Sequence, residues 1–580
     1  MVKRWFALLV IAVLMTGLFP GPSADAAYGD GCFAEANRER YNRPDGAITS
    51  DGRYIEYDYS HLPSPKDMIY VCVNNQFLKT DVPAEIEKGA TLIPMRALLE
   101  KLKADFSWDN KNQTITASLR GKTIRLQVDN KTAVVNGQKV TLETPPRLKN
   151  GRVLVPVRFV TEQLDCQVRW LPNNNIIKIF THPEVKVSFT NAKSIHSDDY
   201  SYGNYFSHSS RYLLENDKSI FLLEDVGDAE LRIQRFTTSF VKKEEFKLKG
   251  ELKDFAGAHL GEDGFYYILY TQDNPEESDS KTVYRLVKYD KAWKKTAYLD
   301  IKDVHVTHPV DASNLTMDSH NGKLVVYTAR ERYRSSDGLN HQSNIMFHID
   351  MDKMTLLYKG GEWPHNHVSH SFATYVRFDG ERIVYADHGD AYPRSIVLQA
   401  EDNGKITQTI ELLKFPGEIG DNYTGAHLGG LEVSDKNYLL TGSSVSLTEK
   451  YGSSRTKNLF LGVIPKTAKS DEDAKLIWIT DHAVNSGNAI VETHLVKLSD
   501  NKFALLWTES KSGNSLFYAV VDGAGKLLKK PAKLEGIPSP GNIAPLVRGN
   551  SIIWTYYTLY HESSHFDVPE GTEFYSLRID

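Results

Sequence analysis

Cysteine and methionine are both scarce in this sequence, with three and eight residues among 580. So few cysteines exclude a small scaffold that is held together by many disulfides. The formal net charge is only −5, so the chain as a whole has no basic excess with which to hold nucleic acid. After residue 19 no uninterrupted apolar run reaches membrane-spanning length. We therefore expect no nucleic-acid partner and no transmembrane segment in the remaining chain.

The composition is that of a soluble globular protein, with 41% hydrophobic and 25% charged residues. The length predicts roughly two to four domains. Aromatic residues make up 11% of the chain, and 30 of them are tyrosines. This content favours β-structure and exposed binding surfaces.

The first residues have the order of a secretory signal peptide. Lys3 and Arg4 precede an apolar segment at residues 5–19, and Ala-Asp-Ala at residues 24–26 follows as a small-x-small cleavage site. Pro20 disfavours the alternative of an uncleaved helical anchor, because proline breaks a helix. The sequence thus predicts an exported protein, either secreted and extracellular or associated with the cell wall, with two segments before its first domain: a signal peptide at 1–26 and a polar leader at 27–68.

The three cysteines, Cys32, Cys72 and Cys166, stand far apart. Their long separations exclude a metal site built on closely spaced thiols. Cys32 lies in the polar leader, and Cys72 lies in an apolar run that predicts a strand. A Cys32–Cys72 disulfide is possible in an exported chain. Buried or unpaired thiols are the alternative.

A short internal repeat lies between residues 69 and 182. Leu-Ile-Pro-Met-Arg at 92–96 recurs as Leu-Val-Pro-Val-Arg at 154–158. Each copy is followed by a segment with a helical pattern and then by a tryptophan, Trp108 or Trp170, in a short strand pattern. Proline suits the first turn of a helix, so each copy predicts a strand that leads directly into a helix.

This repeat resembles the copper amine oxidase N-terminal-like domain, also called a stalk domain. The resemblance covers residues 69–182 and includes Val-Asn-Asn-Gln at 73–76, which is similar to the usual opening hairpin. It implies a small α+β accessory domain of a kind common in secreted and surface proteins of Gram-positive bacteria.

Amine oxidase activity is not implied by this resemblance. That chemistry needs a quinone derived from tyrosine in an Asn-Tyr-Asp/Glu sequence. The three Asn-Tyr pairs of this chain are followed by Phe206, Thr424 and Leu439. We therefore expect no amine oxidase activity.

A longer pattern recurs seven times from about residue 185 onwards. Each copy opens on a small residue that is usually followed by histidine: Ser207-His208, Ala258-His259, Ser313-Asn314, Ser369-His370, Ala426-His427, Thr493-His494 and Ala544-Pro545. An apolar strand pattern follows in every copy, at 219–223, 265–270, 323–327, 382–385, 438–440, 503–507 and 551–554. A third strand comes after a variable loop, at 231–236, 283–289, 345–349, 395–398, 459–463, 516–521 and 574–579. A weaker fourth strand closes most copies.

Four short strands per repeat are the signature of a β-propeller. The sequence therefore predicts a mainly β protein, in which a small α+β domain at 69–182 precedes a seven-bladed β-propeller at 183–580. Six blades, with one copy acting as a linker, are the alternative. The last copy has only three strands, and residues 184–190 have a β pattern. We expect that segment to supply the missing strand and to close the ring.

The first strand of each propeller blade lines the central channel, so the repeated histidine is a candidate ligand-binding residue. Five of the seven copies carry it, and together they would form a partial ring at one channel mouth: His208, His259, His370, His427 and His494. Such a ring suits an anion, a metal or a polar ligand. The alternative is structural, with each imidazole bonded to the backbone of the neighbouring blade.

A metal ion is a possible cofactor at a second group of histidines. His365 and His367 are two residues apart and would point the same way on a strand, close to His370. An ordinary polar loop that contains proline is the alternative.

Loops after the second strands are long, polar and rich in aromatics, which suits the recognition of a glycan, a peptide or a protein. Asp387, Asp390 and Glu418 in or near these loops could act as the acid pair of a carbohydrate-active hydrolase or lyase. No Gly-x-Ser-x-Gly, phosphate-loop or His-Glu-x-x-His motif is present in the sequence. Ordinary exposed loops are the simpler interpretation.

Charge is divided unevenly between the two parts of the chain. Residues 69–182 contain 17 Lys and Arg against 10 Asp and Glu, whereas residues 183–580 carry a net negative charge. A basic small domain suits attachment to an anionic cell-wall polymer; a solvated basic surface is the alternative. The sequence thus predicts an exported, non-catalytic binding or scaffold protein. A secreted hydrolase or lyase and a metal-binding protein are the alternatives.

Overall fold

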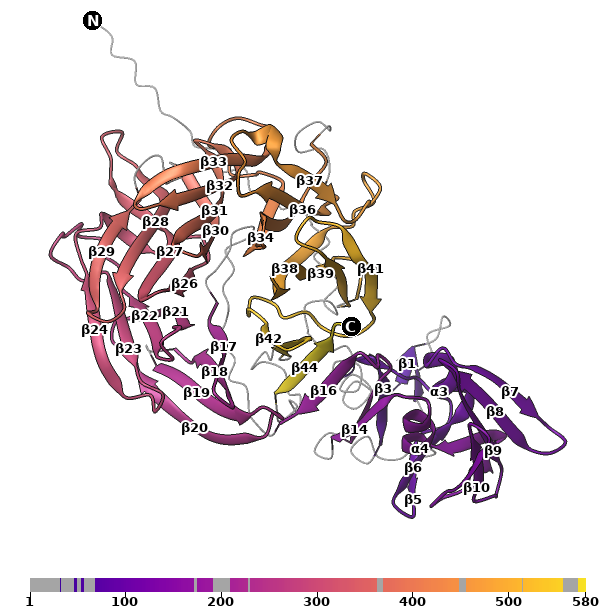
Figure 1. Cartoon of the computed structure of the whole chain (residues 1–580). Helices are drawn as coiled ribbons and strands as arrows, with labels where there is room; N and C mark the ends of the chain where they lie inside the picture. Colours follow the sequence, from indigo (N-terminus) through magenta and orange to yellow (C-terminus); the bar gives the residue numbers. More distant parts are fainter. Residues whose placement is uncertain are drawn as a thin grey trace, which may run out of the picture.

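The computed structural model describes residue 32 and residues 46–48, 54–56, 68–171, 175–190, 209–227, 230–361, 369–447, 455–513, 515–556 and 572–580. The predicted signal peptide and most of the predicted leader lie outside the described residues. Figure 1 shows two parts, a small domain drawn in indigo and a ring of sheets that takes up the rest of the chain. Within the leader, β1 (Gly46–Ile48) pairs with β2 (Tyr54–Glu56).

The small domain combines two short helices with three sheets. The helices are α3 (Met95–Lys101) and α4 (Val157–Gln163). The first sheet contains β4 (Gln76–Phe77), β3 (Tyr70–Val73), β15 (Ile176–Phe180) and β14 (Gln167–Leu171). The second contains β5 (Glu85–Glu87), β6 (Ala90–Pro94), β13 (Arg152–Pro156) and β12 (Arg147–Lys149). The third contains β7 (Asp105–Asp109), β8 (Thr114–Leu119), β9 (Lys122–Gln127), β10 (Thr132–Val135) and β11 (Gln138–Thr141).

The short sequence repeat forms the centre of this small domain. In both copies the strand ends on proline, and the helix begins at the next residue. The two strands pair with each other, so that Ile93 lies opposite Val155. Leu98 and Val160, one from each helix, are buried in a single core with these strands. The predicted strand-to-helix pattern is therefore confirmed, and it buries the apolar face of each short helix.

Cys32 and Cys72 form a disulfide, which is the first of the two alternatives that the sequence left open. Both residues are fully buried beside Tyr70 and Ile176. Cys166 is a free, buried cysteine.

Seven sheets follow one another around the ring in the described residues (Figure 1). The first three contain β17 (Arg211–Asn216), β18 (Ser219–Asp225), β19 (Glu230–Thr237) and β20 (Lys242–Lys249); β21 (Asp254–Leu260), β22 (Tyr266–Thr271), β23 (Tyr284–Tyr289) and β24 (Lys295–Ile301); and β25 (Val306–Pro309), β26 (Thr316–His320), β27 (Lys323–Arg334), β28 (Asn340–Asp350) and β29 (Thr355–Gly360).

The next three contain β30 (Ser369–Asp379), β31 (Arg382–Ala391), β32 (Arg394–Asp402) and β33 (Lys405–Lys414); β34 (Ala426–Val433), β35 (Asn437–Ser444), β36 (Asn458–Pro465) and β37 (Lys475–Trp478); and β38 (Ile490–Ser499), β39 (Lys502–Glu509), β40 (Leu516–Val521) and β41 (Leu527–Leu534). The seventh contains β42 (Leu546–Arg548), β43 (Ser551–Tyr556), β44 (Glu573–Arg578) and β16 (Val185–Phe189). A 3₁₀ turn, η2 (Asp471–Asp473), precedes β37.

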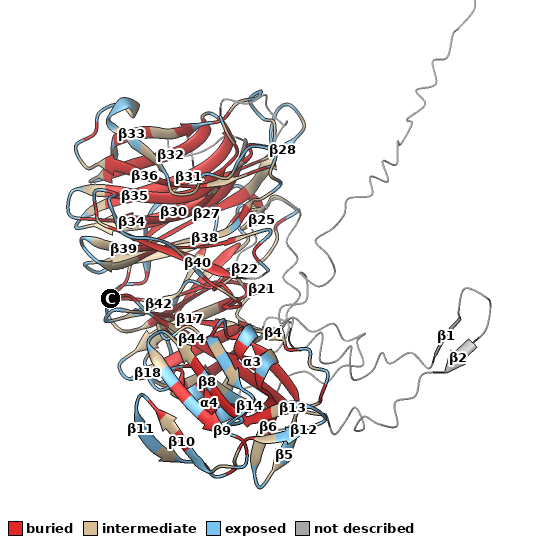
Figure 2. Ribbon diagram, turned by 90° about the vertical axis from the view of Figure 1, so that its right-hand side faces the viewer, coloured by how far each residue is buried: buried red, intermediate tan, exposed pale blue. Residues whose placement is uncertain are grey.

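The middle strands of each sheet form the core of the ring. All six residues of β22, for example, are buried, whereas β20 alternates between exposed and partly buried positions. Figure 2 shows the same contrast, because buried residues fill the middle of the ring and exposed residues gather at the turns. The apolar second and third strands of all seven copies are therefore confirmed where the sequence predicted them.

The segment before the first copy completes the last sheet. β16 pairs with β44 over five residues, from Val185 opposite Leu577 to Phe189 opposite Glu573. The prediction that residues 184–190 supply a fourth strand is thus confirmed. The innermost strands of neighbouring sheets also contact one another in sequence, and β42 contacts β17. The two ends of the large domain are therefore joined by pairing rather than by a loop.

Two features of the copies differ from the prediction. β30 and β34 begin at the predicted residues, but β21 begins four residues before Ala258 and β38 begins three residues before Thr493. The segments 330–343 and 387–394, predicted as loops, largely extend the hairpins β27–β28 and β31–β32. Polar residues in these hairpins are paired and buried, so their hydrophilic composition gave no strand signal.

The small domain packs directly against the seventh sheet and its neighbour. Lys103 of the small domain forms an exposed ion pair with Glu535, and Asn75 Nδ2 donates to the carbonyl oxygen of Gly536 at 2.8 Å. Only residues 181–184 separate β15 of the small domain from β16 of the ring. Among the described residues, no helix has the length and apolarity needed to cross a membrane.

Candidate functional site

The innermost strands carry four of the five predicted channel histidines within the described residues. These are His259 in β21, His370 in β30, His427 in β34 and His494 in β38. His208, and also His365 and His367 of the predicted metal group, lie outside the described residues.

The four histidines do not share one level of the channel. His370 and His427 are each the second residue of their strand, as the sequence predicted. His259 is the last residue but one of β21, close to the opposite edge of the ring, and His494 is in the middle of β38. The expectation that histidine opens the strand is therefore wrong for His259 and His494. The reason is that the first strands mix polar and apolar residues. Their first and last residues could therefore not be located from a hydrophobic pattern.

His427 belongs to a group of basic side chains at the edge where β34 begins. It pairs with Ser443 near the end of β35, and the next residue of β35 pairs with Asn458, which follows Lys457. His427 and Lys457 therefore lie at the same edge of the fifth sheet. Burial lowers the pKa of His427 well below its usual value, and the positive charge of Lys457 acts in the same direction.

Lys457 has an environment that is unusual for a lysine. Its side chain is partly buried, and none of the ion pairs in the described part of the chain includes it. Burial alone lowers the pKa of its ammonium group, without any opposing carboxylate. A lysine that is withdrawn from water without an anion is a candidate site for an anionic group.

His388 lies beside this group, on β31 of the preceding sheet. Its Nε2 is 2.8 Å from Thr424 Oγ1, and its ring has edge contacts with Phe372 and Phe415 at 5.4 and 5.2 Å. These contacts fix the imidazole in one orientation. Its charge when protonated would further lower the pKa of His427.

His494 approaches the same group from β38. Burial lowers its pKa to about 4, and its Nε2 is buried without a hydrogen-bond partner among the described residues. Glu492, two residues earlier, accepts a hydrogen bond from Ser539, and burial raises its pKa. The group therefore contains neutral imidazoles and one lysine. The acid nearest to His494 on β38 is Glu492, and burial favours its neutral form.

A pair of glycines brings β34 and β38 close together. A Cβ atom on Gly429 would lie 2.7 Å from the carbonyl oxygen of Thr493, and one on Gly430 would lie 2.9 Å from Cβ of Leu495. Side chains are excluded at both positions, so the two innermost strands touch along their backbones. This contact places His427 and His494 on neighbouring strands of one narrow part of the channel.

The acidic residues that could serve a hydrolase are held in structural contacts. Asp387 is 2% exposed and accepts hydrogen bonds from Tyr327 at 3.1 Å and from Ser371 at 2.6 Å. Asp390 is fully buried, and its Oδ2 is 3.0 Å from His370 Nδ1. Glu418 is exposed on the loop between β33 and β34.

One group in the described part of the chain has the donor atoms of a metal site. The ligand atoms of Asp279, Asp303 and His305 lie within 4.8 Å of one another, and all three residues are exposed. Lys359 already donates to Asp303 Oδ2 at 2.7 Å, so the local negative charge is partly neutralised. This group is distinct from the histidines that the sequence singled out.

Residues 72–179 match the family model described as the copper amine oxidase N-terminal domain. The small domain is therefore similar to that domain. The match agrees with the resemblance predicted over residues 69–182. It spans less than a fifth of the chain, so it identifies this domain and not the whole protein.

A primary amine oxidase of Klebsiella aerogenes is 30% identical over 73 residues. The matched segment is 13% of this chain and 10% of that protein. The chain therefore shares only a small part of the enzyme's length.

Several solved structures resemble this chain, and one of them is described as a β-propeller domain. The β-propeller domain of the Trilobed protease from Pyrococcus furiosus has 12% identity and a TM-score of 0.31, over 74% of this chain and 97% of that chain. The Pyrococcus horikoshii acylaminoacyl peptidase has 10% identity and a TM-score of 0.33, over 60% of this chain and 49% of that chain. Drosophila Plexin A in complex with Semaphorin 1b has 9% identity and a TM-score of 0.36, over 64% and 86%. Likenesses of this size assign no activity to this chain.

Sequence reasoning missed two members of the basic group. His388 falls in a segment predicted as a loop, and Lys457 falls at the end of another. Nothing in the sequence around Lys457 signals that it is withdrawn from water, because the burial is produced by neighbouring sheets. The histidines themselves carried the only usable signal, as a repeated residue at equivalent positions.

Proposed function

We propose that this protein is an exported, non-catalytic binding protein whose channel holds an anionic group at Lys457, His427 and His494. The observation that carries the proposal is Lys457, a partly buried cation without a carboxylate partner in the described part of the chain. A bound carboxylate, sulfate or phosphate would restore the charge balance and would accept hydrogen bonds from the ammonium group.

The ring that supports this site is proposed to be a seven-bladed propeller closed by β16. Pairing of β16 with β44 links the two ends of the large domain, and this pairing stabilises a ring against separation of its first and last sheets. A rigid ring suits binding, because the ligand does not have to order the site first.

A hydrolase has less support than a binding protein. Asp387 and Asp390 are buried and hydrogen-bonded, so neither is placed to protonate a leaving group in a shared cleft. The disulfide between Cys32 and Cys72 supports an oxidising, extracellular location.

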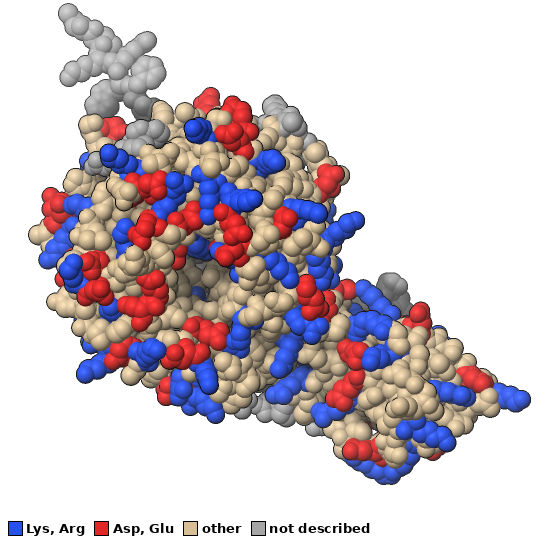
Figure 3. Space-filling view, viewed as in Figure 1, with Lys and Arg blue, Asp and Glu red and all other residues tan. Residues whose placement is uncertain are grey.

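The small domain is proposed to attach the protein to an anionic cell-wall polymer. Arg125 of β9 and Lys139 of β11 both lie opposite Val134 of β10, so they share one face of the sheet. Both side chains are exposed, and no ion pair in the described residues includes them. Figure 3 shows Lys and Arg side chains spread over the visible face of the small domain, with Asp and Glu side chains among them.

Isothermal titration calorimetry with the full-length mature protein tests the channel site. The probes are sulfate, inorganic phosphate, acetate and D-galacturonate. We expect at least one probe to bind, and its affinity to fall about tenfold or more in Lys457→Met. Lys436→Met is the matched control, since Lys436 is an exposed lysine of the same sheet at its opposite edge. No binding, or equal binding to Lys457→Met, would overturn the proposal.

Retention on purified cell-wall sacculi tests the attachment. We expect salt-sensitive retention of the full-length protein and its loss in Arg125→Glu/Lys139→Glu. Lys526→Glu/Lys530→Glu makes the same charge change on exposed residues of the ring and is expected to retain binding. Equal behaviour of the two double variants would contradict attachment through the small domain.

A further inference from the structure

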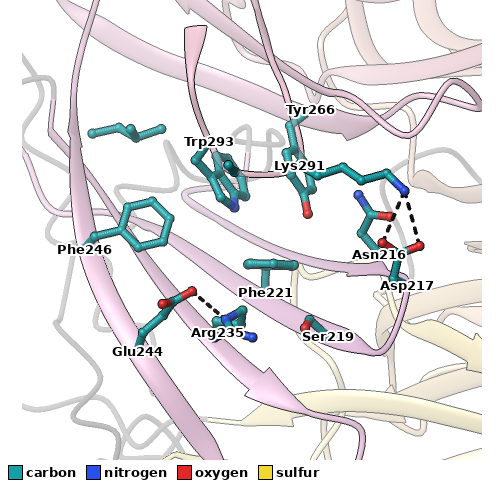
Figure 4. Close-up of a pocket in the computed structure, with 12 residues that line it drawn as sticks. Asn216, Asp217, Ser219, Phe221, Arg235, Glu244, Phe246, Tyr266, Lys291 and Trp293 are labelled. Atoms are coloured by element: carbon teal, nitrogen blue, oxygen red, sulfur yellow. Dashed lines mark hydrogen bonds and ion pairs between the residues drawn. The ribbon is translucent and has the colours of Figure 1, made fainter.

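A pocket on the flank of the ring lies between the first and second sheets and is separate from the channel (Figure 4). Its volume is about 380 Å³, which is within the usual range of small-molecule sites. One wall comes from β18, β19 and β20, and the other comes from β22 and the turn after β23. The turn between β17 and β18 lies at one end, so the pocket opens at the edge of the ring opposite the start of the innermost strands.

Aromatic side chains form the inner wall of the pocket. Trp293 stacks on Tyr266 with ring centres 3.9 Å apart and an angle of 8° between the planes. Phe246 and Phe221 contact the indole at 5.9 and 5.6 Å with steep ring angles. Such a wall offers ring faces and edges to C–H groups of a ligand.

Trp293 is held rigidly and has an unused donor. Its backbone adopts a φ of 61°, and its N–H donates to the carbonyl oxygen of Asp290 at 2.9 Å. The side chain is only 7% exposed, yet its indole Nε1 has no hydrogen-bond partner among the described residues. In Figure 4 the indole nitrogen is drawn on the side of the ring that faces Phe221 and Arg235. That nitrogen has almost no surface open to solvent, so the indole lines the pocket as part of its apolar wall.

Two ion pairs frame the opening, and the two charges within each pair cancel. Arg235 pairs with Glu244, and Lys291 Nζ lies 3.2 Å from Asp217 Oδ2. Each pair leaves further donors and acceptors exposed, because a guanidinium has five N–H groups and a carboxylate has four lone pairs. The pocket therefore has many hydrogen-bonding groups without a net charge, which disfavours an ionic ligand and suits a neutral one.

We propose that this pocket binds one pyranose ring of a neutral glycan. A pyranose combines a C–H face, which suits Phe246 and Trp293, with hydroxyl groups that both donate and accept. Those hydroxyl groups match the exposed polar groups of Arg235 and Glu244. This site is independent of the anion proposed for the channel, because the two lie at different edges of the ring and share no residue.

Ligand-detected and protein-detected NMR on the full-length mature protein test the proposal. The probes are methyl glycosides of glucose, galactose and N-acetylglucosamine, with glucuronate and N-acetylglycinamide as comparisons. We expect saturation transfer to the ring protons of at least one neutral glycoside. The same glycoside should shift one of the eight tryptophan indole signals, which Trp293→Phe then assigns by its disappearance.

Neighbouring residues on β20 supply a matched pair of variants. Glu244 lines the pocket, whereas Glu245 points to the other face of the strand and bonds with Lys242 and Gln234. Glu244→Gln and Phe246→Ala are each expected to weaken the glycoside about tenfold, and Glu245→Gln is expected to bind like the wild type. Lys457→Met should also bind the glycoside normally, which separates this site from the channel.

Three results would overturn the proposal: no neutral glycoside binds, binding survives both pocket variants, or only glucuronate or the amide shifts the indole signal of Trp293. Thermal unfolding of Glu244→Gln is the control for folding. An unfolding transition like that of the wild type would mean that a loss of binding is not a loss of structure.

Discussion

Lys178 of the small domain forms an ion pair with Glu573 of the ring, and the lysine side chain is 1% exposed. Tyr575 donates a second hydrogen bond to the same carboxylate, and the rings of Phe180 and Phe189 lie within 6 Å of the ammonium group. The pair therefore lies at the point where the chain leaves the small domain and enters the ring. It ties the two domains together at the strand that completes the seventh sheet.

Lys178→Met is expected to destabilise the protein by about 3 kcal/mol, because removal of one partner leaves Glu573 poorly solvated and unpaired. Lys103→Met is the matched control, since it removes a second, exposed ion pair between the domains. Its side chain is 76% exposed, so a loss of about 1 kcal/mol or less is expected. Chemical denaturation followed by circular dichroism measures both values. Equal losses in the two variants would contradict the importance of the buried pair.

Gly429→Ala is expected to destabilise the contact between β34 and β38 by about 1–3 kcal/mol, because the new methyl group meets Thr493. Thr493→Gly in the same chain should recover part of that loss, since it removes the side chain that the methyl group meets. A double-mutant cycle on unfolding free energies measures this coupling. Purely additive effects would show that the two strands are further apart than described.

The stability of the protein should fall as the pH drops from about 6.5 to about 4. Burial lowers the pKa of both His259 and His494 to about 4. Over this range the unfolded chain takes up protons that the folded protein does not, so acid favours unfolding by at most about 1.4 kcal/mol per pH unit for each histidine.

Denaturant unfolding at several pH values measures this dependence. His494→Gln should reduce the slope between pH 4 and 6.5, because it removes one of the two buried imidazoles. An unaltered slope in His494→Gln would mean that His494 titrates alike in the folded and unfolded states.

Alkylation of the native protein should leave Cys166 unmodified. The thiol is buried, and burial raises its pKa, so both access and thiolate content are low. Under non-reducing denaturing conditions Cys166 alone should react, because Cys32 and Cys72 are paired. Mass spectrometry counts the modified residues. Reduction of the disulfide should lower the unfolding free energy by about 2–4 kcal/mol, and three alkylated cysteines without reductant would refute the pairing.

Much of the fold could be predicted because its signals are local. The Pro-Met-Arg and Pro-Val-Arg sequences, at residues 94–96 and 156–158, mark strand-to-helix junctions. The second and third strands are short runs of apolar residues, which mark buried strands. The pairing of residues 184–190 with the last copy could also be predicted, since a copy with three strands requires an additional strand. The innermost strands were located less well, because their residues face a channel and are mixed in polarity.

The candidate sites could be predicted from the sequence only in part. A repeated histidine pointed to His427 and His494, but His494 lies in the middle of its strand and not at its start, which the sequence did not indicate. Lys457 and His388 could not be found, since their burial comes from packing between sheets that are distant in sequence. The flank pocket at Trp293 likewise depends on a turn from one sheet that packs on the strands of another.

The most direct measurement of the central claim is the pKa of Lys457, followed by NMR of ¹³C-dimethylated lysines and assigned with Lys457→Arg. In buffer without added anion the signal is predicted to titrate below 10.5, the usual lysine value. Added sulfate or inorganic phosphate is predicted to raise that pKa, because an anion in the channel stabilises the charged form. A signal that titrates at the usual value, or that does not respond to either anion, would contradict an anion site at Lys457.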